Sequence, residues 1–245
     1  MTDSADAKPD LRRALAAKAD DPEGLGQVLA DPSITDLDLR HALRGKLPAS
    51  VSVYVLERSR FGTRQTVLGA VARSSSTAPR TALAALPGLA WRDLADVAVA
   101  AELAAAVRHK AETLLLDGLN AMRLGDLVTL SRIGSRRVTT RLLLSAEPLV
   151  RAAGLENPRL LDEDVCAILE SDKAPREIAV EILRVHRWAV SYQVRLAIVR
   201  SFLTPHPTSL PLIAQMNPKD LRDLAHSDDV PPLVSAVARR LLGLR

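Results

Sequence analysis

The sequence predicts an all-α protein, and three observations carry that prediction. The chain of 245 residues contains only two phenylalanines, two tryptophans and two tyrosines, whereas β-sandwiches and barrels usually depend on aromatic and β-branched side chains. Apolar residues recur with helical spacing in short segments. The two halves of the chain also resemble each other. With 47% hydrophobic and 25% charged residues, the composition is that of an ordinary globular protein.

The expected helices are short and follow one another closely. Helical periodicity is clear at residues 51–56, 67–71 and 103–114, and again at 178–183, 194–198 and 234–241. Side chains that cap helices mark several starts, among them Thr77, Thr204 and Asp162, and Pro205 suits a first turn. Helices of two to four turns cannot bury their apolar faces alone, so each must pack on the next. This logic predicts a continuous right-handed α-solenoid.

An internal repeat extends over most of the chain. Shifting the sequence by 127 residues aligns Lys46–Leu115 with Lys173–Leu242 without a gap, and 20 of the 70 pairs are identical. After a one-residue slip, residues 31–39 lie over residues 157–165, and Pro22 falls on Pro148. The sequence therefore predicts two tandem copies of a unit of about 120 residues.

The repeat also sets the expected domain organisation. Residues 1–10 are expected to form a flexible N-terminus, and residues 11–245 a single continuous helical-repeat domain. Its halves would span about 11–120 and 126–245, joined near Asn120–Asp126. Because stacked repeats share an apolar interface, we expect the two halves to unfold together.

Two turn motifs resemble known helical-repeat families. The pattern Val-Arg-Leu-Ala-Ile-Val-Arg-x3-Thr-Pro-x4-Leu at 194–210 is echoed at 67–83, and Asn-Pro-x-Leu occurs at 157–160. These motifs resemble bacterial leucine-rich-repeat-variant and HEAT/armadillo-like arrays. The resemblance implies a superhelix of short helices that serves as a protein-binding surface. The leucine-rich-repeat-variant prototype carries an N-terminal cysteine cluster for an iron–sulfur centre, which this chain lacks, so no cofactor is implied.

The single cysteine and the apolar runs indicate where the protein works. Cys166 alone can form neither an intramolecular disulfide nor a multi-thiolate metal site, which fits a reducing compartment. The first ten residues are polar and acidic rather than a signal peptide. The longest apolar run, residues 94–107, contains two carboxylates and falls short of the roughly 20 residues that span a bilayer. We expect a cytoplasmic protein without a membrane segment.

The sequence offers no catalytic or metal-binding constellation. The five histidines are scattered, and no Gly-rich phosphate loop or nucleophile elbow occurs. Cys166 has Asp162 and Glu170 near it, and these carboxylates should raise the pKa of the thiol and leave it inert. An enzyme on a helical-repeat scaffold, such as a DNA glycosylase, would use an aromatic-rich cleft. We therefore expect no enzymatic activity and no metal.

The candidate partner-binding residues centre on a segment rich in arginine and aromatic side chains. Arg187-Trp188 aligns with Arg60-Phe61, so an Arg–aromatic pair recurs in both halves. One interpretation makes the aromatic ring a spacer between helices, with the arginine packed over it. The other makes the pair a surface anchor for a partner, since Arg and Trp are favoured at interfaces. On one continuous helix, Trp188 and the arginines would form an exposed stripe, with Val185, Val190 and Val194 facing the core. The candidates are Arg184, Arg187, Trp188, Tyr192, Arg195, Arg60 and Phe61.

The charge distribution suggests a second candidate function. Residues 1–126 hold 16 basic and 16 acidic side chains, whereas residues 127–245 hold 17 and 13. The candidate phosphate-binding residues are Arg132, Arg136, Arg137 and Arg141. The favoured hypothesis is a non-enzymatic binding or scaffold module for a protein or peptide, and the alternative is phosphate or nucleic-acid binding through the basic second half. Steep loss of affinity with salt would distinguish the alternative.

Overall fold

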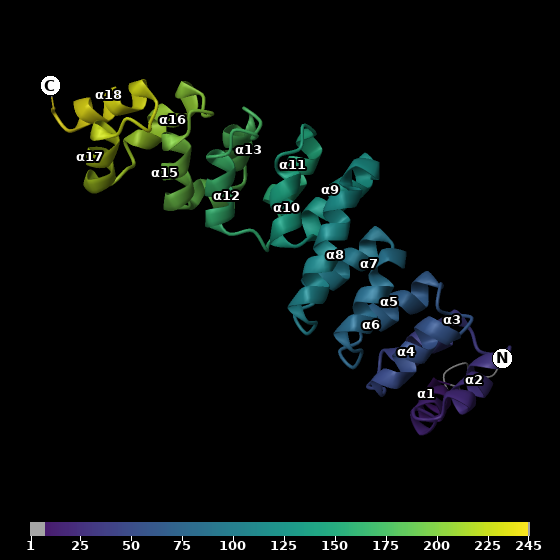
Figure 1. Ribbon diagram of the computed structural model, residues 1–245. Coiled ribbons are helices and arrows are strands. Elements are labelled where there is room, and N and C mark those ends of the chain that lie inside the picture. The colour runs from purple at the N-terminus through teal and green to yellow at the C-terminus, as the bar shows by residue number, and fades with distance from the viewer. Residues whose placement is uncertain (1–7, 245) are drawn as a thin grey trace. The chain divides into compact units, whose positions relative to one another are not determined.

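The computed structural model describes residues 8–244, and these residues form eighteen α-helices and two short 3₁₀ helices without a β-strand (Figure 1). The prediction of an all-α fold is confirmed. The chain divides into two compact units, Met1–Ala121 and Met122–Arg245, which we call unit 1 and unit 2. The sequence places its join near the same point, at Asn120–Asp126. That the two halves unfold as one domain stays a prediction.

Unit 1 contains eight α-helices and two single-turn 3₁₀ helices. They are α1 (Lys8–Ala17), α2 (Pro22–Ala30), α3 (Asp36–Leu43), α4 (Ala49–Arg58), α5 (Gln65–Arg73), α6 (Pro79–Ala85), η1 (Leu86–Gly88), α7 (Trp91–Val99), α8 (Ala105–Gly118) and η2 (Leu119–Ala121). Helix α1 begins inside the segment that was expected to be flexible, so residues 8–10 are helical. The rest of that segment, residues 1–7, lies outside the described residues.

Unit 2 contains the remaining ten α-helices. They are α9 (Leu124–Ile133), α10 (Arg136–Leu142), α11 (Pro148–Leu155), α12 (Asp162–Leu169), α13 (Ile178–Arg184), α14 (His186–Val190), α15 (Tyr192–Arg200), α16 (His206–Ile213), α17 (Pro218–His226) and α18 (Pro232–Leu241). None of the helices among the described residues has the length and apolar character needed to cross a membrane.

Helix bounds in the two units correspond at the offsets that align the sequence. Helix α15 begins and ends 127 residues after α5, and α17 does the same relative to α7. Helix α12 begins and ends 126 residues after α3, on the other side of the one-residue slip. The internal sequence similarity therefore coincides with the order and position of these helices.

Within each unit, helices pack on their second neighbours along the chain. In unit 1, α3 contacts α1 and α5, while α4 contacts α2 and α6. In unit 2, α11 contacts α9 and α13, while α12 contacts α10 and its third neighbour α15, because both α13 and α14 lie between them along the chain. Sequential helices also contact each other, as α5 and α6 or α7 and α8 do (Figure 1). Each short helix thereby buries an apolar face that it could not bury alone.

The helix starts differ from the expected caps by one residue. The backbone N–H of Leu161 donates to the Asp164 carboxylate at 2.8 Å, so Asp164 rather than Asp162 serves the start of α12. Helices α6 and α16 begin after Ala78 and Pro205, and the threonines before them, Thr77 and Thr204, do not cap. Both threonines are buried instead. A hydroxyl in that position needs a partner from another helix.

The partner of the buried threonine exists in unit 1 and is missing in unit 2. The hydroxyl oxygens of Ser52 and Thr77 lie 3.1 Å apart in a buried hydrogen bond. In unit 2, the residue that aligns with Ser52 is the buried Ala179, and the Thr204 hydroxyl has no hydrogen-bond partner among the described residues. The aligned positions of the two units thus contain a satisfied and an unsatisfied version of the same contact.

Two single substitutions, one in each unit, should change the free energy of unfolding in opposite directions. Ser52→Ala leaves the Thr77 hydroxyl unpaired, and we expect it to lower the free energy of unfolding by about 1–3 kcal/mol. Ala179→Ser supplies the missing partner for Thr204, and we expect a gain of about 0.5–1.5 kcal/mol. Urea unfolding followed by circular dichroism measures both changes. A loss of stability in Ala179→Ser would contradict the assigned contact.

Candidate binding cavities

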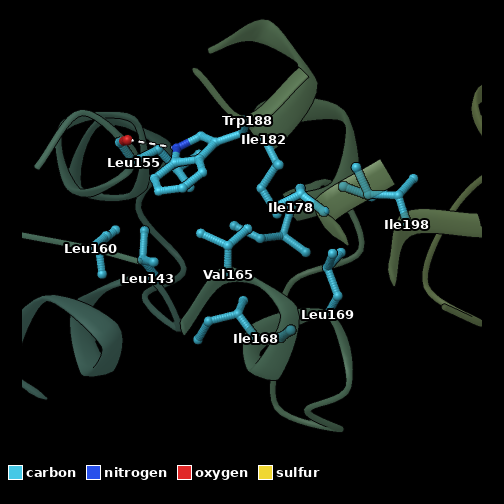
Figure 2. Close-up of a cluster of buried hydrophobic side chains, with 13 residues drawn as sticks. Leu143, Leu155, Leu160, Val165, Ile168, Leu169, Ile178, Ile182, Trp188 and Ile198 are labelled. Carbon is cyan, nitrogen blue, oxygen red and sulfur yellow. Dashed lines mark hydrogen bonds between the residues drawn. The ribbon is translucent and has the colours of Figure 1, made fainter. Parts of the chain in front are cut away.

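Both repeated aromatic rings are buried. Phe61 is 3% exposed and Trp188 is 0% exposed. Figure 2 shows Trp188 inside the hydrophobic cluster of unit 2, near Leu155, with its indole N–H donating to the Leu155 carbonyl oxygen at 2.8 Å. Neither ring is available to a partner, so the assignment of Phe61 and Trp188 as surface anchors is wrong. Burial of both rings agrees with the spacer interpretation, which stays a prediction until the stability cost of removing a ring is measured.

The arginine of each pair holds the turn that precedes an earlier helix. The guanidinium carbon of Arg60 lies 4.7 Å from the Phe61 ring centre, and that of Arg187 lies 4.2 Å from the Trp188 ring centre. Arg60 donates to the carbonyl oxygen of Ile34, and Arg187 donates to that of Leu160, which aligns with Ile34. Each guanidinium therefore links its ring to the turn before α3 or α12. The recurrence of the pair reflects this structural role.

The expected stripe over residues 184–195 does not form. The chain leaves helical geometry at Val185 and at Ser191, whose hydroxyl accepts from the Val194 N–H and caps α15. The segment therefore contains parts of three helices, and Val190 is 57% exposed instead of facing the core. One helical face cannot collect these side chains.

The remaining residues of that segment divide between internal contacts and solvent. The Tyr192 hydroxyl donates to the Asp220 carboxylate and accepts from the Asn217 N–H at 3.1 Å. Burial and the bond to Asp220 raise the pKa of Tyr192. Arg195 is half-buried and donates to the Gln215 side-chain oxygen at 2.6 Å, whereas Arg184 is exposed. The structure thus brings Tyr192 and Arg195 into contacts within unit 2.

Two of the four predicted phosphate-binding arginines of unit 2, Arg132 and Arg136, lie close to carboxylates. Arg136 makes two 2.9 Å hydrogen bonds to Asp164 and also contacts Glu163, and these partners raise its pKa. Arg132 lies 3.4 Å from Glu156. Arg137 and Arg141 are exposed. An anion at this surface would have to compete with the carboxylates that Arg132 and Arg136 already contact.

A cavity occurs at corresponding positions in the two units, and sequence reasoning did not find it. The unit 1 cavity, about 260 Å³, lies between the turn after α3, the end of α5 with its following turn, and the turn before α8. The unit 2 cavity, about 470 Å³, lies between the turn after α12, the end of α15 with its following turn, and the turn before α18. The unit 1 lining is Arg44, Gly45, Lys46, Ala70, Arg73, Ser74, Ser75, Ser76 and Glu102. The unit 2 lining is Leu169, Glu170, Ser171, Asp172, Ala197, Arg200, Ser201, Phe202, Leu203, Ser227 and Asp229.

The two cavities share a floor and differ in their walls. The aligned pairs Ala70/Ala197, Arg73/Arg200 and Ser74/Ser201 are identical. Apart from this floor, the unit 1 lining carries two cationic side chains and one carboxylate. The unit 2 lining carries three carboxylates and no further cationic side chain, together with two large apolar residues where unit 1 has serines. Corresponding cavities therefore offer opposite charge to a ligand.

Phe202 is the notable residue of the unit 2 cavity. Its side chain is 67% exposed, whereas the other five aromatic side chains of the protein are buried or half-buried. Exposed aromatic residues are enriched at protein interfaces. The signal in the sequence was the repeat alignment, which sets Phe202 opposite Ser75. A polar residue in one copy and a large apolar residue in the other mark a position that the core does not need.

The pKa of Cys166 is shifted in the direction that the sequence predicts. The thiol is half-buried, and burial, followed by the charges of Asp162 and Glu170, raises its pKa. A raised pKa leaves the thiol neutral at pH 7.5, so little of the nucleophilic thiolate is present. We expect iodoacetamide to alkylate Cys166 in the folded protein more slowly than free glutathione at pH 7.5. The rate should keep rising with pH beyond about 8.5, the ordinary thiol pKa. Alkylation faster than that of glutathione would contradict this assignment.

The fold and the cavities define an all-helical protein whose two units carry corresponding recesses. Comparisons of this chain with protein-family models, with curated proteins and with solved structures found no match. Among residues 8–244, no three histidine, cysteine, aspartate or glutamate side chains come together as a group that could hold a metal ion.

Proposed function

We propose that the protein is a non-enzymatic binding module that holds a protein partner at the unit 2 cavity. The observation that carries this proposal is Phe202, an aromatic side chain 67% exposed on the wall of a recess. Covering such a side chain with an apolar surface of a partner would remove it from water, which is favourable. Aromatic anchors that fill a recess are also the side chains that contribute most to binding free energy in protein interfaces.

The proposed architecture is a cytoplasmic helical-repeat scaffold of two tandem copies. The sequence identity between halves, the helix bounds that coincide at a fixed offset, and the packing of second-neighbour helices all support a HEAT/armadillo-like or leucine-rich-repeat-variant-like α-solenoid. Such scaffolds expose a large surface on which side chains vary while the core is retained. The two cavities differ in the same way, because their lining side chains vary while the helices around them correspond. The single Cys166 with its raised pKa fits a reducing compartment.

Charge complementarity selects the partner's chemistry. Glu170, Asp172 and Asp229 surround Phe202 and are exposed, and none of them forms an ion pair with another described residue. A segment that carries arginine or lysine beside an aliphatic or aromatic side chain would satisfy both the carboxylates and the ring. A nucleic acid fits this cavity poorly, because its phosphates would face three carboxylates. A protein partner is therefore favoured over the alternative of nucleic-acid binding.

Selection from a random peptide library on the full chain tests this function. We expect the selected peptides to combine basic and apolar residues. Phe202→Ser, which installs the residue of unit 1, should weaken their binding by about 30-fold or more, the effect of losing a 2 kcal/mol anchor. Leu149→Ser is the matched control, since Leu149 is 63% exposed on α11 and lies outside the cavity lining. Equal affinity of Phe202→Ser and the unchanged protein would contradict the proposal.

A further inference from the structure

Several side-chain donors of the unit 1 cavity lining have no partner among the described residues. Arg44 and Lys46 are exposed and make no ion pair with another described residue. The side-chain hydroxyls of Ser74, Ser75 and Ser76 line the same recess and form no hydrogen bond with a described group. A space of about 260 Å³ is therefore lined by residues that carry three hydroxyls and two cationic groups.

A further cationic group lies beside this cavity. The Arg12 guanidinium packs against Gly45, so closely that a Cβ at residue 45 would lie 2.2 Å from its central carbon. A glycine at position 45 is therefore what allows Arg12 to approach the turn after α3. Arg12 adds positive charge at the edge of the recess without filling it.

Two carboxylate contacts reduce the positive charge of the cavity but do not cancel it. Arg73 donates to Asp93 at 2.6 Å and lies 3.4 Å from Asp96, so this arginine is neutralised within the protein. Glu102 is the one carboxylate in the lining. Against it stand Arg44, Lys46 and the neighbouring Arg12. The recess keeps an excess of positive charge and of N–H and O–H donors.

We infer that the unit 1 cavity is a binding site for a phosphate monoester group. A phosphate monoester carries a charge near −2 and three acceptor oxygens, which matches a recess with three hydroxyls and two cationic donors. A carboxylate has only two oxygens and would leave donors unpaired. The volume is below the roughly 300–1,000 Å³ of pockets for drug-sized ligands, so it suits a single phosphate group. This site is distinct from the peptide-binding function proposed for unit 2.

Unit 2 contains the control for this inference. The turn after α12 places Glu170 in the cavity lining where the turn after α3 places Arg44, and Lys173, which aligns with Lys46, is not part of the unit 2 lining. Phe202 and Leu203 replace the hydroxyls of Ser75 and Ser76. The unit 2 lining keeps Ser201, whose hydroxyl donates to the Leu169 carbonyl oxygen at 2.8 Å, but it has no hydroxyl or cationic group in place of Arg44, Ser75 and Ser76. A phosphate group should bind at one of two corresponding cavities in one molecule.

Titration of the full chain, followed by amide ¹H–¹⁵N shifts at constant ionic strength, tests the inference. The probes are inorganic phosphate and N-acetyl-phosphoserine amide, with N-acetyl-serine amide as the neutral reference. We expect saturable shifts at residues 44–46 and 74–76 with both phosphate probes and none with the reference. Tighter binding of the phosphoserine probe would identify a phosphorylated partner as the source, and equal binding would identify free phosphate.

Paired charge-removal variants separate a specific site from general attraction. Arg44→Gln/Lys46→Gln should weaken phosphate binding at least about tenfold, because two charge-assisted hydrogen bonds are lost. Lys173→Gln/Arg200→Gln removes two charges from unit 2 and should leave the affinity unchanged. The four side chains are exposed, so the variants should fold, and their melting temperatures check this. Equal weakening in both pairs, or no saturable shift at residues 74–76, would overturn the inference. So would a single-stranded oligonucleotide that binds this cavity more tightly than the monoester probes.

Discussion

Replacing Trp188 with alanine is expected to lower the free energy of unfolding by about 3–5 kcal/mol, the usual cost of removing a core aromatic side chain. The ring is 0% exposed and lies in the cluster that joins α11, α12, α13 and α15 (Figure 2). Its removal opens a cavity, leaves the Leu155 carbonyl oxygen without the indole donor, and frees Arg187 from its stacking partner. Urea unfolding followed by circular dichroism measures the loss.

Trp188→Phe separates the contribution of the ring from that of the hydrogen bond. Phenylalanine occupies the aligned position of unit 1, so the backbone of the repeat accepts it. The variant retains most of the buried apolar surface and loses the bond to Leu155, which should cost about 1–3 kcal/mol. If Trp188→Ala lowered the free energy of unfolding by less than about 1 kcal/mol, the ring would not be a structural spacer.

Replacing Arg151 with leucine is expected to lower the free energy of unfolding by a similar amount. Arg151 is only 2% exposed, and its guanidinium makes two hydrogen bonds to Glu181, at 2.7 and 2.6 Å. It also donates to the carbonyl oxygens of Ser145 and Ala146, which fixes the turn before α11. The bond to Glu181 raises the pKa of Arg151. Removing one partner of a buried pair leaves the other charge uncompensated, at a cost of about 3–5 kcal/mol.

The aligned residues of unit 1 indicate a second substitution that should compensate for the loss of stability. Leu25 and Tyr54 occupy the positions that align with Arg151 and Glu181. The double variant Arg151→Leu/Glu181→Tyr removes both charges and should recover most of the loss, because apolar replacement of a whole buried ion pair is often close to neutral. A double variant no more stable than Arg151→Leu in thermal unfolding would contradict this account of the pair.

The helical fold was predictable because its signals are local. Apolar spacing and frequent turn residues indicated short helices, and the 127-residue offset placed α15 and α17 correctly from α5 and α7. The predictions of helix starts and caps were wrong where a single residue decides the local structure. Ser191 starts a new helix, so Trp188 and Tyr192 do not share the stripe that a single helix would give. Thr77 and Thr204 precede helices, as a cap would, but their hydroxyls face the interior.

The cavities could not be predicted, because each is assembled from three turns that are far apart in sequence. Arg44, Ser75 and Glu102 meet only after helices α4 to α7 have folded between them. The basic excess of the second half suggested a phosphate site there, yet Arg132 and Arg136 lie beside carboxylates. The alignment of the two halves sets Ser75 opposite Phe202, and this contrast is visible without a structure.

Photo-crosslinking from the unit 2 cavity tests the central claim most directly. A photoreactive benzoylphenylalanine replaces Phe202 in one sample and Leu149 in a second, and each protein is irradiated with a selected basic-apolar peptide. The account predicts crosslinks from position 202 to the peptide's basic-apolar segment, few from position 149, and suppression by excess unlabelled peptide. Crosslinks of equal yield from both positions, or crosslinks between copies of the protein itself in place of the peptide, would contradict it.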